Sequence, residues 1–372
     1  MMTVQGKEII DILEAWAPKQ LAYDWDNVGL QVGTLNKPIS KVMISLDVLE
    51  NVVDEAIEKQ VNLIIAHHPL LFSALKSVNT NTPKGRVIEK LIKHDISVYA
   101  AHTNLDIACG GVSDILADKL GVYDTKVLIP DTYESLYKLV VYSPVSHAQR
   151  IKTALAESGA GHIGNYSDCF FESRGEGSFK PLAGTNPYIG KQGEEEKVEE
   201  ARIETIVPDH LIKRAIEAVQ EAHPYEEVAY DLIPLKNQGN PIGAGRIGQL
   251  PETMLLSDFC EVVKKKLEVS VVRVTGNLNE IVQKVAILGG SGKGFINQAK
   301  AMGADVYVTG DMAFHEAQDA EQMGLSVIDP GHYVEKVMKQ AVQSHLQRQL
   351  KDANLDTEVI ISNVSTDPFK FV

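Results

Sequence analysis

Cysteine is scarce in this chain of 372 residues, which contains three: Cys109, Cys169 and Cys260. No two of them form a Cys-X-X-Cys pair, so the sequence argues against a disulfide framework and against a thiolate zinc site. We interpret the three as small apolar residues of the interior.

Long apolar runs are also missing. No window approaches the roughly 18 uninterrupted apolar residues of a membrane-spanning helix. The first residues, MMTVQGKEIIDILEAW, carry charges inside their apolar pattern, which predicts an amphipathic helix and not a signal peptide. We therefore expect a cytoplasmic protein without a membrane partner.

Basic residues are outnumbered, with 36 Lys and Arg against 50 Asp and Glu and a formal net charge of −14. Sequence-independent binding to nucleic acid needs a basic surface, so this balance argues against a nucleic-acid partner. The acidic stretch GEEEKVEEARIE at 193–204 is interpreted as a solvated face. Other acidic groups are available to hold cations.

The two ends of the chain share an alternation of predicted strands and helices. In the first third, strand patterns occur at 41–48, 62–69 and 96–102, and helical patterns at 51–60, 85–95 and 110–121. The same alternation returns after a polar linker at 236–245. It predicts an α/β fold, with a mostly parallel sheet flanked by helices.

The middle of the chain has a different order. Its predicted elements are a strand at 137–144, a helix at 146–161, a hairpin at 166–182, a strand at 201–209, a helix at 210–223 and a strand at 226–235. This β-α-β-β-α-β order is that of a ferredoxin-like domain. We predict such an α+β domain at 132–235, inserted into an outer α/β domain whose halves are 1–131 and 236–372.

Polar residues collect where four predicted strands of the outer domain end. These residues are His67 and His68, then His102 and Asp106, then Asp311 followed by His315, and finally His332 and Glu335. Because the carboxyl ends of parallel strands lie at one edge of a sheet, we expect them to meet there.

Three histidines and two carboxylates of this set form a candidate site for two divalent metal ions: His67, His68, Asp106, His332 and Glu335. Imidazole and carboxylate ligands suit Zn, Fe, Mn or Co, with Zn or Fe favoured. His332 and Glu335 share one face of a predicted helix. Each residue also has a structural alternative, such as a backbone hydrogen bond for a histidine, a capping role for Asp106 or a helix-dipole role for Glu335.

The glycine-rich stretch GGSGKG at 289–294 follows a predicted strand and precedes a predicted helix. The amides of Gly289, Gly290, Ser291 and Gly292 could cradle an anion. A Walker A loop is excluded because its Lys is followed by Gly294 instead of Ser or Thr. A tight strand–helix turn without a ligand explains the pattern equally well.

Several motifs together resemble the Nif-three-like family of dinuclear-metal proteins, often labelled GTP cyclohydrolase I type 2 homologs. They are AYDWDNVGLQVG (22–33), IIAHHPLLF (64–72), AAHTNLD (100–106), LGGSGKG (288–294), YVTGD (307–311) and DPGHYVEK (329–336). The resemblance implies that the five candidate ligands bind two ions per subunit, with Glu335, alone or together with Asp106, bridging or completing the pair. Some relatives place this glutamate four residues after its histidine, whereas the separation here is three. Both spacings share one helix face.

The resemblance also has implications for assembly and function. The middle segment, including AHPYEEVAYDLIPL (222–235), resembles a PII-like or CutA-like insertion, and the family forms ring-shaped homohexamers with trimeric caps. We expect a metal-dependent hydrolase acting on a small substrate, for which a purine nucleotide is a candidate. Asp311, His315 and His102 are then candidates for orienting ligands or transferring protons. The alternative is a non-catalytic metal-binding, metal-delivery or regulatory protein.

Overall fold

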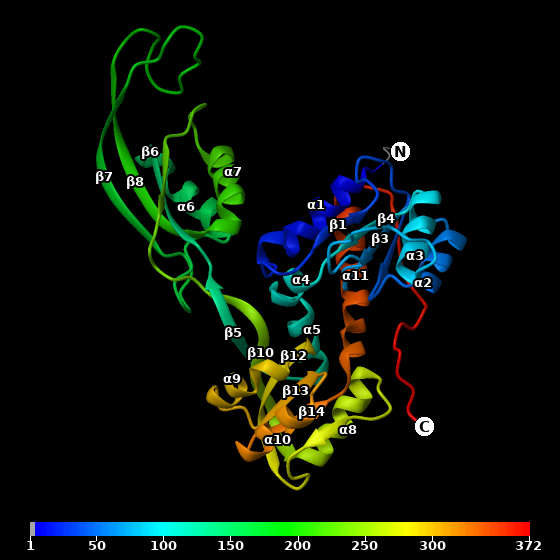
Figure 1. Ribbon diagram of the computed structural model, residues 1–372. Helices are drawn as coiled ribbons and strands as arrows, with labels where there is room; N and C mark the ends of the chain where they lie inside the picture. Colours follow the sequence, from blue (N-terminus) through cyan, green and yellow to red (C-terminus); the bar gives the residue numbers. More distant parts are fainter. Residues whose placement is uncertain (1–3) are drawn as a thin grey trace. The chain divides into compact units, whose positions relative to one another are not determined.

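The computed structural model describes residues 4–372 and shows a mixed α/β protein (Figure 1). The α/β class predicted from the sequence is thereby confirmed. The described residues form two compact units. The outer unit contains the chain up to Asp131 together with Ile242–Val372, and the middle unit contains Thr132–Pro241.

The α-helices of the described chain are α1 (Gly6–Trp16), α2 (Glu50–Glu58), α3 (Pro83–Lys93), α4 (Thr103–Ile107), α5 (Val112–Leu120), α6 (Ala148–Glu157), α7 (Ile212–Ala222), α8 (Leu256–Leu267), α9 (Ile296–Ala301), α10 (Phe314–Gln322) and α11 (Val337–Asp352). Local sequence explains several of their ends. At the start of α3, the Thr82 hydroxyl accepts a hydrogen bond from the Gly85 amide at 3.1 Å, and Pro83 occupies the first turn. Helix α5 ends at Gly121, whose φ of 72° lies in the left-handed region. None of these helices is both long enough and apolar enough to cross a membrane.

The strands are β1 (Gly29–Val32), β2 (Lys41–Ser45), β3 (Leu63–Ala66), β4 (Ser97–Ala100), β5 (Tyr123–Tyr133), β6 (Leu136–Pro144), β7 (Phe170–Phe179), β8 (Glu196–Pro208), β9 (Tyr230–Pro234), β10 (Pro241–Leu255), β11 (Arg273–Thr275), β12 (Ile281–Ser291), β13 (Val306–Gly310), β14 (Ser326–Asp329) and β15 (Glu358–Ile361). They form three sheets, two of which lie in the outer unit.

The first sheet of the outer unit has the order β1-β4-β3-β2-β15. Its strands β4, β3, β2 and β15 are parallel, and β1 pairs with β4 in the antiparallel direction. Strands β3 and β4 are buried along their whole length, which is typical of parallel strands covered on both faces.

The second sheet has the order β11-β14-β13-β12-β10-β5 and is mixed. Strands β12, β13 and β14 are parallel, whereas β11 and β10 pair with their neighbours β14 and β12 in the antiparallel direction. The expectation of one mostly parallel sheet is therefore not confirmed, because the outer unit divides its strands between two sheets. Alternating strand and helix patterns identify strands but do not specify which of them pair.

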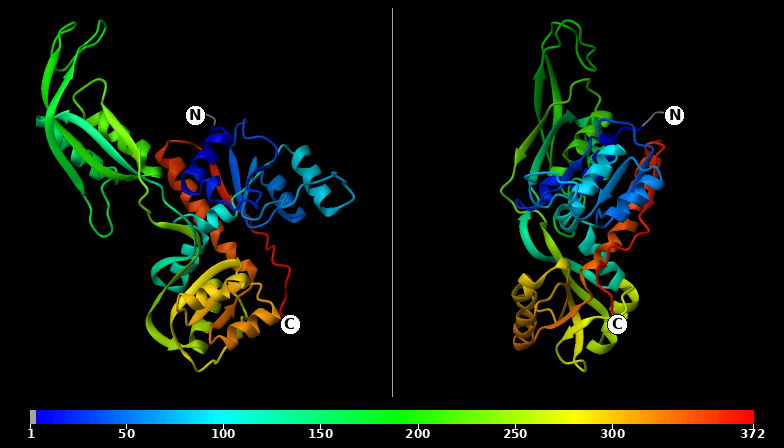
Figure 2. Two further views of the ribbon diagram at one scale, coloured as in Figure 1. Left: turned by 60° about the vertical axis from the view of Figure 1, so that its left-hand side comes forward. Right: turned by 45° about the vertical axis from the view of Figure 1, so that its right-hand side comes forward.

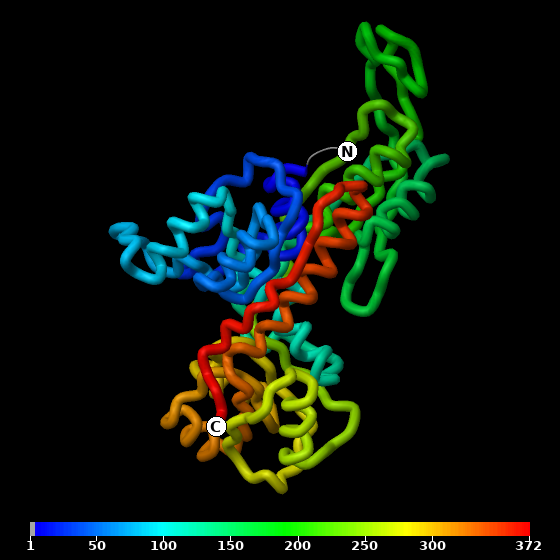
Figure 3. Tube along the Cα trace, turned by 90° about the vertical axis from the view of Figure 1, so that its right-hand side faces the viewer, coloured from blue at the N-terminus to red at the C-terminus, as the bar shows by residue number. Residues whose placement is uncertain are grey.

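One hydrophobic core joins the two sheets of the outer unit. It contains Leu63 and Ile65 from β3, Val285 and Ile287 from β12, and Leu346 from α11, all of them fully or almost fully buried. Helix α11 packs against α1, α5, β2 and β15, and the segment after β15 then runs toward the second-sheet side of the same unit (Figure 3). This shared core holds the carboxyl ends of both sets of parallel strands in fixed positions.

The middle unit is a four-stranded antiparallel sheet of order β7-β8-β6-β9, with α6 and α7 packed against each other. The long strands β7 and β8 run side by side (Figure 2). The sequence predicts a hairpin within 166–182, but β7 pairs instead with β8, beyond a connection at 180–195. Most of the acidic stretch at 193–204 therefore belongs to β8, in which exposure alternates with partial or full burial.

Candidate metal centre

The two sheets of the outer unit bring their strand ends to one place. In the first sheet, β3 is followed by His67 and His68, and β4 by His102. In the second sheet, β14 is followed by a 3₁₀ helix, η5 (His332–Lys336), which carries Glu335. The sequence analysis placed these residues at the edge of a single sheet. They lie instead where the strand ends of two sheets face each other, and the five candidate ligands are still close together.

The geometry of η5 aligns His332 with Glu335. The sequence predicts that these two residues share one face of a helix, and the structure places them in a 3₁₀ turn that precedes α11. A 3₁₀ helix has three residues per turn, so side chains three residues apart lie directly above one another. The turn begins after Gly331, whose φ of 86° suits glycine.

The carboxylate of Glu335 lies at the centre of the cluster and is only 3% exposed. Its Oε2 atom is 3.1 Å from His68 Nε2, 3.1 Å from His332 Nε2 and 3.7 Å from His67 Nε2. The Oδ1 atom of Asp106 lies 3.5 Å from His67 Nε2. Glu335 therefore belongs to two groups at once, one with His68 and His332 and the other with His67 and Asp106. In each group the potential ligand atoms lie within 4.8 Å of one another.

Every histidine around the centre has its Nδ1 atom held by an oxygen acceptor. The pairs are His67 with the Ala101 carbonyl at 2.8 Å, His68 with Asp47 at 2.7 Å, His332 with Asp311 at 2.8 Å and His102 with Asp26 at 2.9 Å. Such a bond places a proton on Nδ1 and orients the ring, so that Nε2 is the atom that can bind a metal ion once it carries no proton.

Two buried polar atoms at the centre have no hydrogen-bond partner among the described residues: His67 Nε2 and Asp106 Oδ1. Unpaired buried polar atoms are costly, and in native proteins they usually indicate a missing partner. Both atoms belong to the group formed by His67, Asp106 and Glu335. Imidazole nitrogens and carboxylate oxygens are ligands for Zn, Fe, Mn or Co, so the residues fit divalent ions of this kind.

The surroundings change the proton affinity of these groups in the absence of an ion. Burial opposes the charged form of His68, but hydrogen bonds to Asp47 and Glu335 outweigh it and raise its pKa to about 10. The hydrogen bond to Glu335 raises the pKa of His332 to about 9. Burial raises the pKa of Asp106 to about 6. Burial also acts to raise the pKa of Glu335, but hydrogen bonds from the histidines hold it well below its usual range.

Of the three residues predicted to orient ligands or transfer protons, His102 and Asp311 lie at the centre and His315 does not. His102 forms a third possible metal-binding group with His67 and His68, and Asp311 contacts His332. His315 is exposed, and its Nδ1 atom lies 3.3 Å from the Gln318 side chain, outside the groups just described.

The sequence predictions omitted two acids that contact the histidines: Asp47 and Asp26. Asp47 comes shortly after the end of β2, so the strand-end rule that identified His67 could also have found it. Asp26 lies in the motif AYDWDNVGLQVG, and its side chain is fully buried against His102. Burial and contact with His102 and Thr103 act on it in opposite directions, and the net effect lowers its pKa to about 2.

The glycines of the 289–294 stretch lie against Glu335. A Cβ atom at Gly289 would come within 3.0 Å of Glu335 Oε1, and one at Gly290 within 2.7 Å. The amide of Gly292 donates to Thr309 at 2.9 Å, and α9, which follows, is only six residues long. In this arrangement the glycines provide space for the carboxylate.

Replacing Gly290 with alanine should therefore disturb the centre. Its φ of 61° is unfavourable for alanine, and the new methyl group would displace Glu335. We expect a destabilisation of about 1–3 kcal/mol and a measurable loss of bound metal. Gly294→Ala is the matched control because a Cβ atom there meets nothing within 4 Å. Thermal melts and metal analysis of both variants test this, and equal metal content would contradict it.

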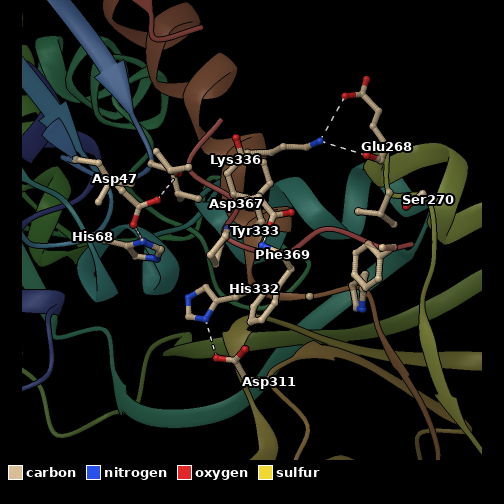
Figure 4. Close-up of a pocket in the computed structure, with 18 residues that line it drawn as sticks. Asp47, His68, Glu268, Ser270, Asp311, His332, Tyr333, Lys336, Asp367 and Phe369 are labelled. Atoms are coloured by element: carbon tan, nitrogen blue, oxygen red, sulfur yellow. Dashed lines mark hydrogen bonds and ion pairs between the residues drawn. The ribbon is translucent and has the colours of Figure 1, made fainter. Parts of the chain in front are cut away.

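A cavity of about 760 Å³ opens beside His68 and His332 (Figure 4). Asp47 and Asp311 also line it, as do Tyr333, Lys336 and Phe369 from η5 and the C-terminal segment. The C-terminal segment is tied to the centre because the Thr366 hydroxyl donates to Asp47, the same carboxylate that holds His68. A small molecule in this cavity would lie next to the candidate ligands.

Changing Asp47 to asparagine should weaken metal binding without removing a ligand. The carboxylate that accepts the His68 Nδ1 proton would be lost, and the asparagine amide could instead donate to Nδ1 and favour the wrong tautomer. We expect a loss of metal affinity of about 10–100-fold, measured by competition with a chromogenic chelator. Asp54→Asn on α2, an exposed acid paired with Lys90, should leave the affinity unchanged. Unchanged affinity in Asp47→Asn would show that this contact does not support the site.

The fold and the cluster together define an α/β protein with a candidate metal-binding site of histidines and carboxylates. Comparison with known families gives a closer assignment. The Duf34/NIF3 (NGG1p interacting factor 3) family matches residues 4–368, and the chain belongs to this family. This confirms the resemblance drawn from the sequence motifs.

Individual relatives are similar over their whole length. The chain is 53% identical over 372 residues to a Halalkalibacterium halodurans protein named GTP cyclohydrolase 1 type 2 homolog, with 100% of both chains covered. It is 51% identical to a Bacillus subtilis protein of the same name, with 100% of this chain and 99% of the relative covered. A crystal structure of a Bacillus cereus protein related to NIF3 matches with a TM-score of 0.89 and 52% identity, again with 100% of both chains covered.

Proposed function

We propose that the protein holds two divalent metal ions at this centre. His67, Asp106 and Glu335 would bind one ion, and His68, His332 and Glu335 the other. The observation that carries this proposal is that two groups of potential ligands share one buried carboxylate, Glu335. Shared carboxylates are a common feature of two-metal sites in proteins.

We infer that the centre serves a hydrolase. A pair of divalent ions supplies Lewis acidity and lowers the pKa of water, which suits the hydrolysis of an ester, amide or ring C–N bond. The protein's own residues would orient this chemistry. Asp47 and Asp311 hold the rings of His68 and His332, and Asp26 presents the Nε2 atom of His102 beside the centre, where it can bind an ion or carry a proton.

The lining of the cavity beside His68 and His332 favours a small substrate. It offers aromatic surface from Tyr333 and Phe369 and a basic group from Lys336. The aromatic rings suit a planar base, and the two proposed metal ions would attract its phosphates despite the acidic side chains of the lining, so a purine nucleotide is our leading candidate. The names of the relatives, GTP cyclohydrolase 1 type 2 homolog, agree with this choice.

The proposal is tested by a hydrolase screen on purified protein reloaded separately with Zn, Fe, Mn and Co. The screen includes GTP, other nucleotides and generic phosphoesters and amides. Metal-dependent turnover that is lost in a His68→Ala variant would support the hydrolase. Full metal occupancy with no turnover of any substrate would favour the alternative of a metal-binding or metal-delivery protein.

For the middle unit we propose an inserted ferredoxin-like domain of the PII-like or CutA-like kind. The antiparallel order β7-β8-β6-β9, with two helices, supports it. By family resemblance, this domain would form trimeric caps on a homohexamer.

Light scattering of the full-length protein should then give the mass of a hexamer. Deletion of 132–241 with a short linker should weaken the assembly but leave metal binding intact, since every proposed ligand lies in the outer unit. A monomeric full-length protein would contradict the assembly proposal and leave the metal proposal standing.

A further inference from the structure

A separate cavity of about 410 Å³ lies within the middle unit. It is bounded by β7, β8, the connection at 180–195 and the segment that follows α7. No candidate metal ligand lies in this unit, and the proposed hydrolase has no use for the cavity. The cavity is therefore independent of the metal centre.

Aromatic rings from three segments form much of the wall. The Tyr225 ring centroid lies 5.7 Å from that of Phe179 and 6.3 Å from that of Tyr188. Tyr188 is 56% exposed, so part of its ring faces solvent. The aromatic surface is thus accessible to a molecule that enters from solvent.

A backbone and histidine network holds Tyr225 in place. His223 accepts a hydrogen bond from the Tyr225 amide at 3.0 Å through Nδ1 and donates to the Tyr142 carbonyl at 2.9 Å through Nε2. Burial lowers the pKa of His223, which favours this neutral form. The wall is therefore positioned before any ligand arrives.

The cavity also contains a carboxylate for which the fold makes room. A Cβ atom at Gly177 would come within 2.2 Å of Glu200 Oε2, so only glycine allows Glu200 to take this position. The buried hydroxyl of Tyr225 interacts with the Glu200 carboxylate. Burial raises the pKa of Glu200, and burial together with the Glu200 charge raises the pKa of Tyr225 to about 12. The tyrosine therefore remains a neutral hydrogen-bonding group at pH 7.

Charge decides which class of ligand fits. Glu226 and Glu227 line the cavity besides Glu200, whereas Lys180 is the only base among the described lining residues. Glu226 is already engaged by the Asn186 amide at 3.1 Å. An anion would be repelled, and a purely apolar ligand would take water from the Glu200 carboxylate without offering it an opposite charge.

We propose that this cavity binds a small organic cation, namely an amine, a guanidinium or a quaternary ammonium compound. Aromatic faces attract such cations, and Glu200 supplies the opposite charge. The site would give the middle unit a ligand of its own, independent of the metal centre.

The test uses full-length protein and pairs of probes that differ in charge. Choline and its neutral isostere 3,3-dimethylbutan-1-ol form one pair, and agmatine and putrescine extend the cation set. We expect saturable binding of at least one cation in calorimetry or ligand-observed NMR at millimolar concentrations or below. We also expect choline to bind about tenfold more tightly than its neutral isostere.

Two variants locate the site. Glu200→Gln should weaken cation binding about tenfold, whereas Glu199→Gln, on the opposite face of β8 and exposed, should leave it unchanged. Tyr188→Leu removes a partly exposed ring, so it should weaken binding without unfolding the protein. The proposal is overturned if no cation binds, if the neutral isostere binds equally well, or if Glu200→Gln and Tyr188→Leu both behave like Glu199→Gln.

Discussion

In a Glu335→Gln protein, we expect the metal content to fall from about two ions per chain to one or none. Glu335 is the only carboxylate in the group with His68 and His332, so this group would keep two neutral imidazoles and no charged oxygen. The group with His67 would retain Asp106 and would lose its ion less completely. Elemental analysis of protein reloaded with a single metal measures the difference.

The matched control for this variant is Glu268→Gln. Glu268 lines the cavity beside His68 and His332 and pairs with Lys336, but it belongs to none of the possible metal-binding groups. Its removal should leave both ions in place. Full occupancy in the Glu335→Gln protein would refute the bridging role of this carboxylate.

Metal binding at pH 7 should release about two protons per chain. Before an ion binds, the pKa values of His68 and His332 are raised to about 10 and about 9, so both rings are protonated at neutral pH. An ion must displace the Nε2 proton of each. Apparent affinity should therefore rise up to about 100-fold per pH unit across the neutral range. Calorimetry in buffers of different ionisation enthalpy counts the protons.

The same shifts affect the stability of protein stripped of metal. A pKa raised above the usual value of 6.5 means that protonation stabilises the fold. This stabilisation is complete below pH 6.5 and is lost as the pH rises through 9 to 10. Stripped protein should thus lose stability on going from pH 7 to pH 10, by more than reloaded protein does.

A His315→Gln variant provides the control for the count of released protons and for the pH dependence of stability. His315 is exposed and stands apart from the centre, so its removal should change neither the number of protons released nor the pH profile. If wild-type protein binds metal without releasing protons, the proposed protonation of His68 and His332 is wrong.

The sequence predicted the convergence of the ligands better than it predicted the sheets. His67 and His68 after a buried strand, and His332 with Glu335 after another, follow from the rule that polar residues at strand ends face a site. The rule holds here even though β3 and β14 belong to different sheets. The division into two sheets depends on which strands pair across the core, and no local pattern encodes this choice.

The supporting residues were harder to predict because their roles depend on tertiary contacts. Asp47 accepts a hydrogen bond from His68, which lies 21 residues away in the sequence. Asp26 accepts one from His102, which lies 76 residues away. The glycines at 289 and 290 are a similar case. Their pattern suggests amides that face an anion, but the structure places the carboxylate of Glu335 against them. Whether a glycine makes room for a ligand or for a side chain is decided only when the fold is complete.

The most direct test of the metal centre is elemental analysis of purified full-length protein, stripped with a chelator and reloaded separately with Zn, Fe, Mn and Co. With its preferred metal, the protein should bind about two ions per chain, and a His67→Ala/His68→Ala double variant should bind none or fewer than one. Wild-type protein that is folded and retains no ion with any of the four metals would contradict the account.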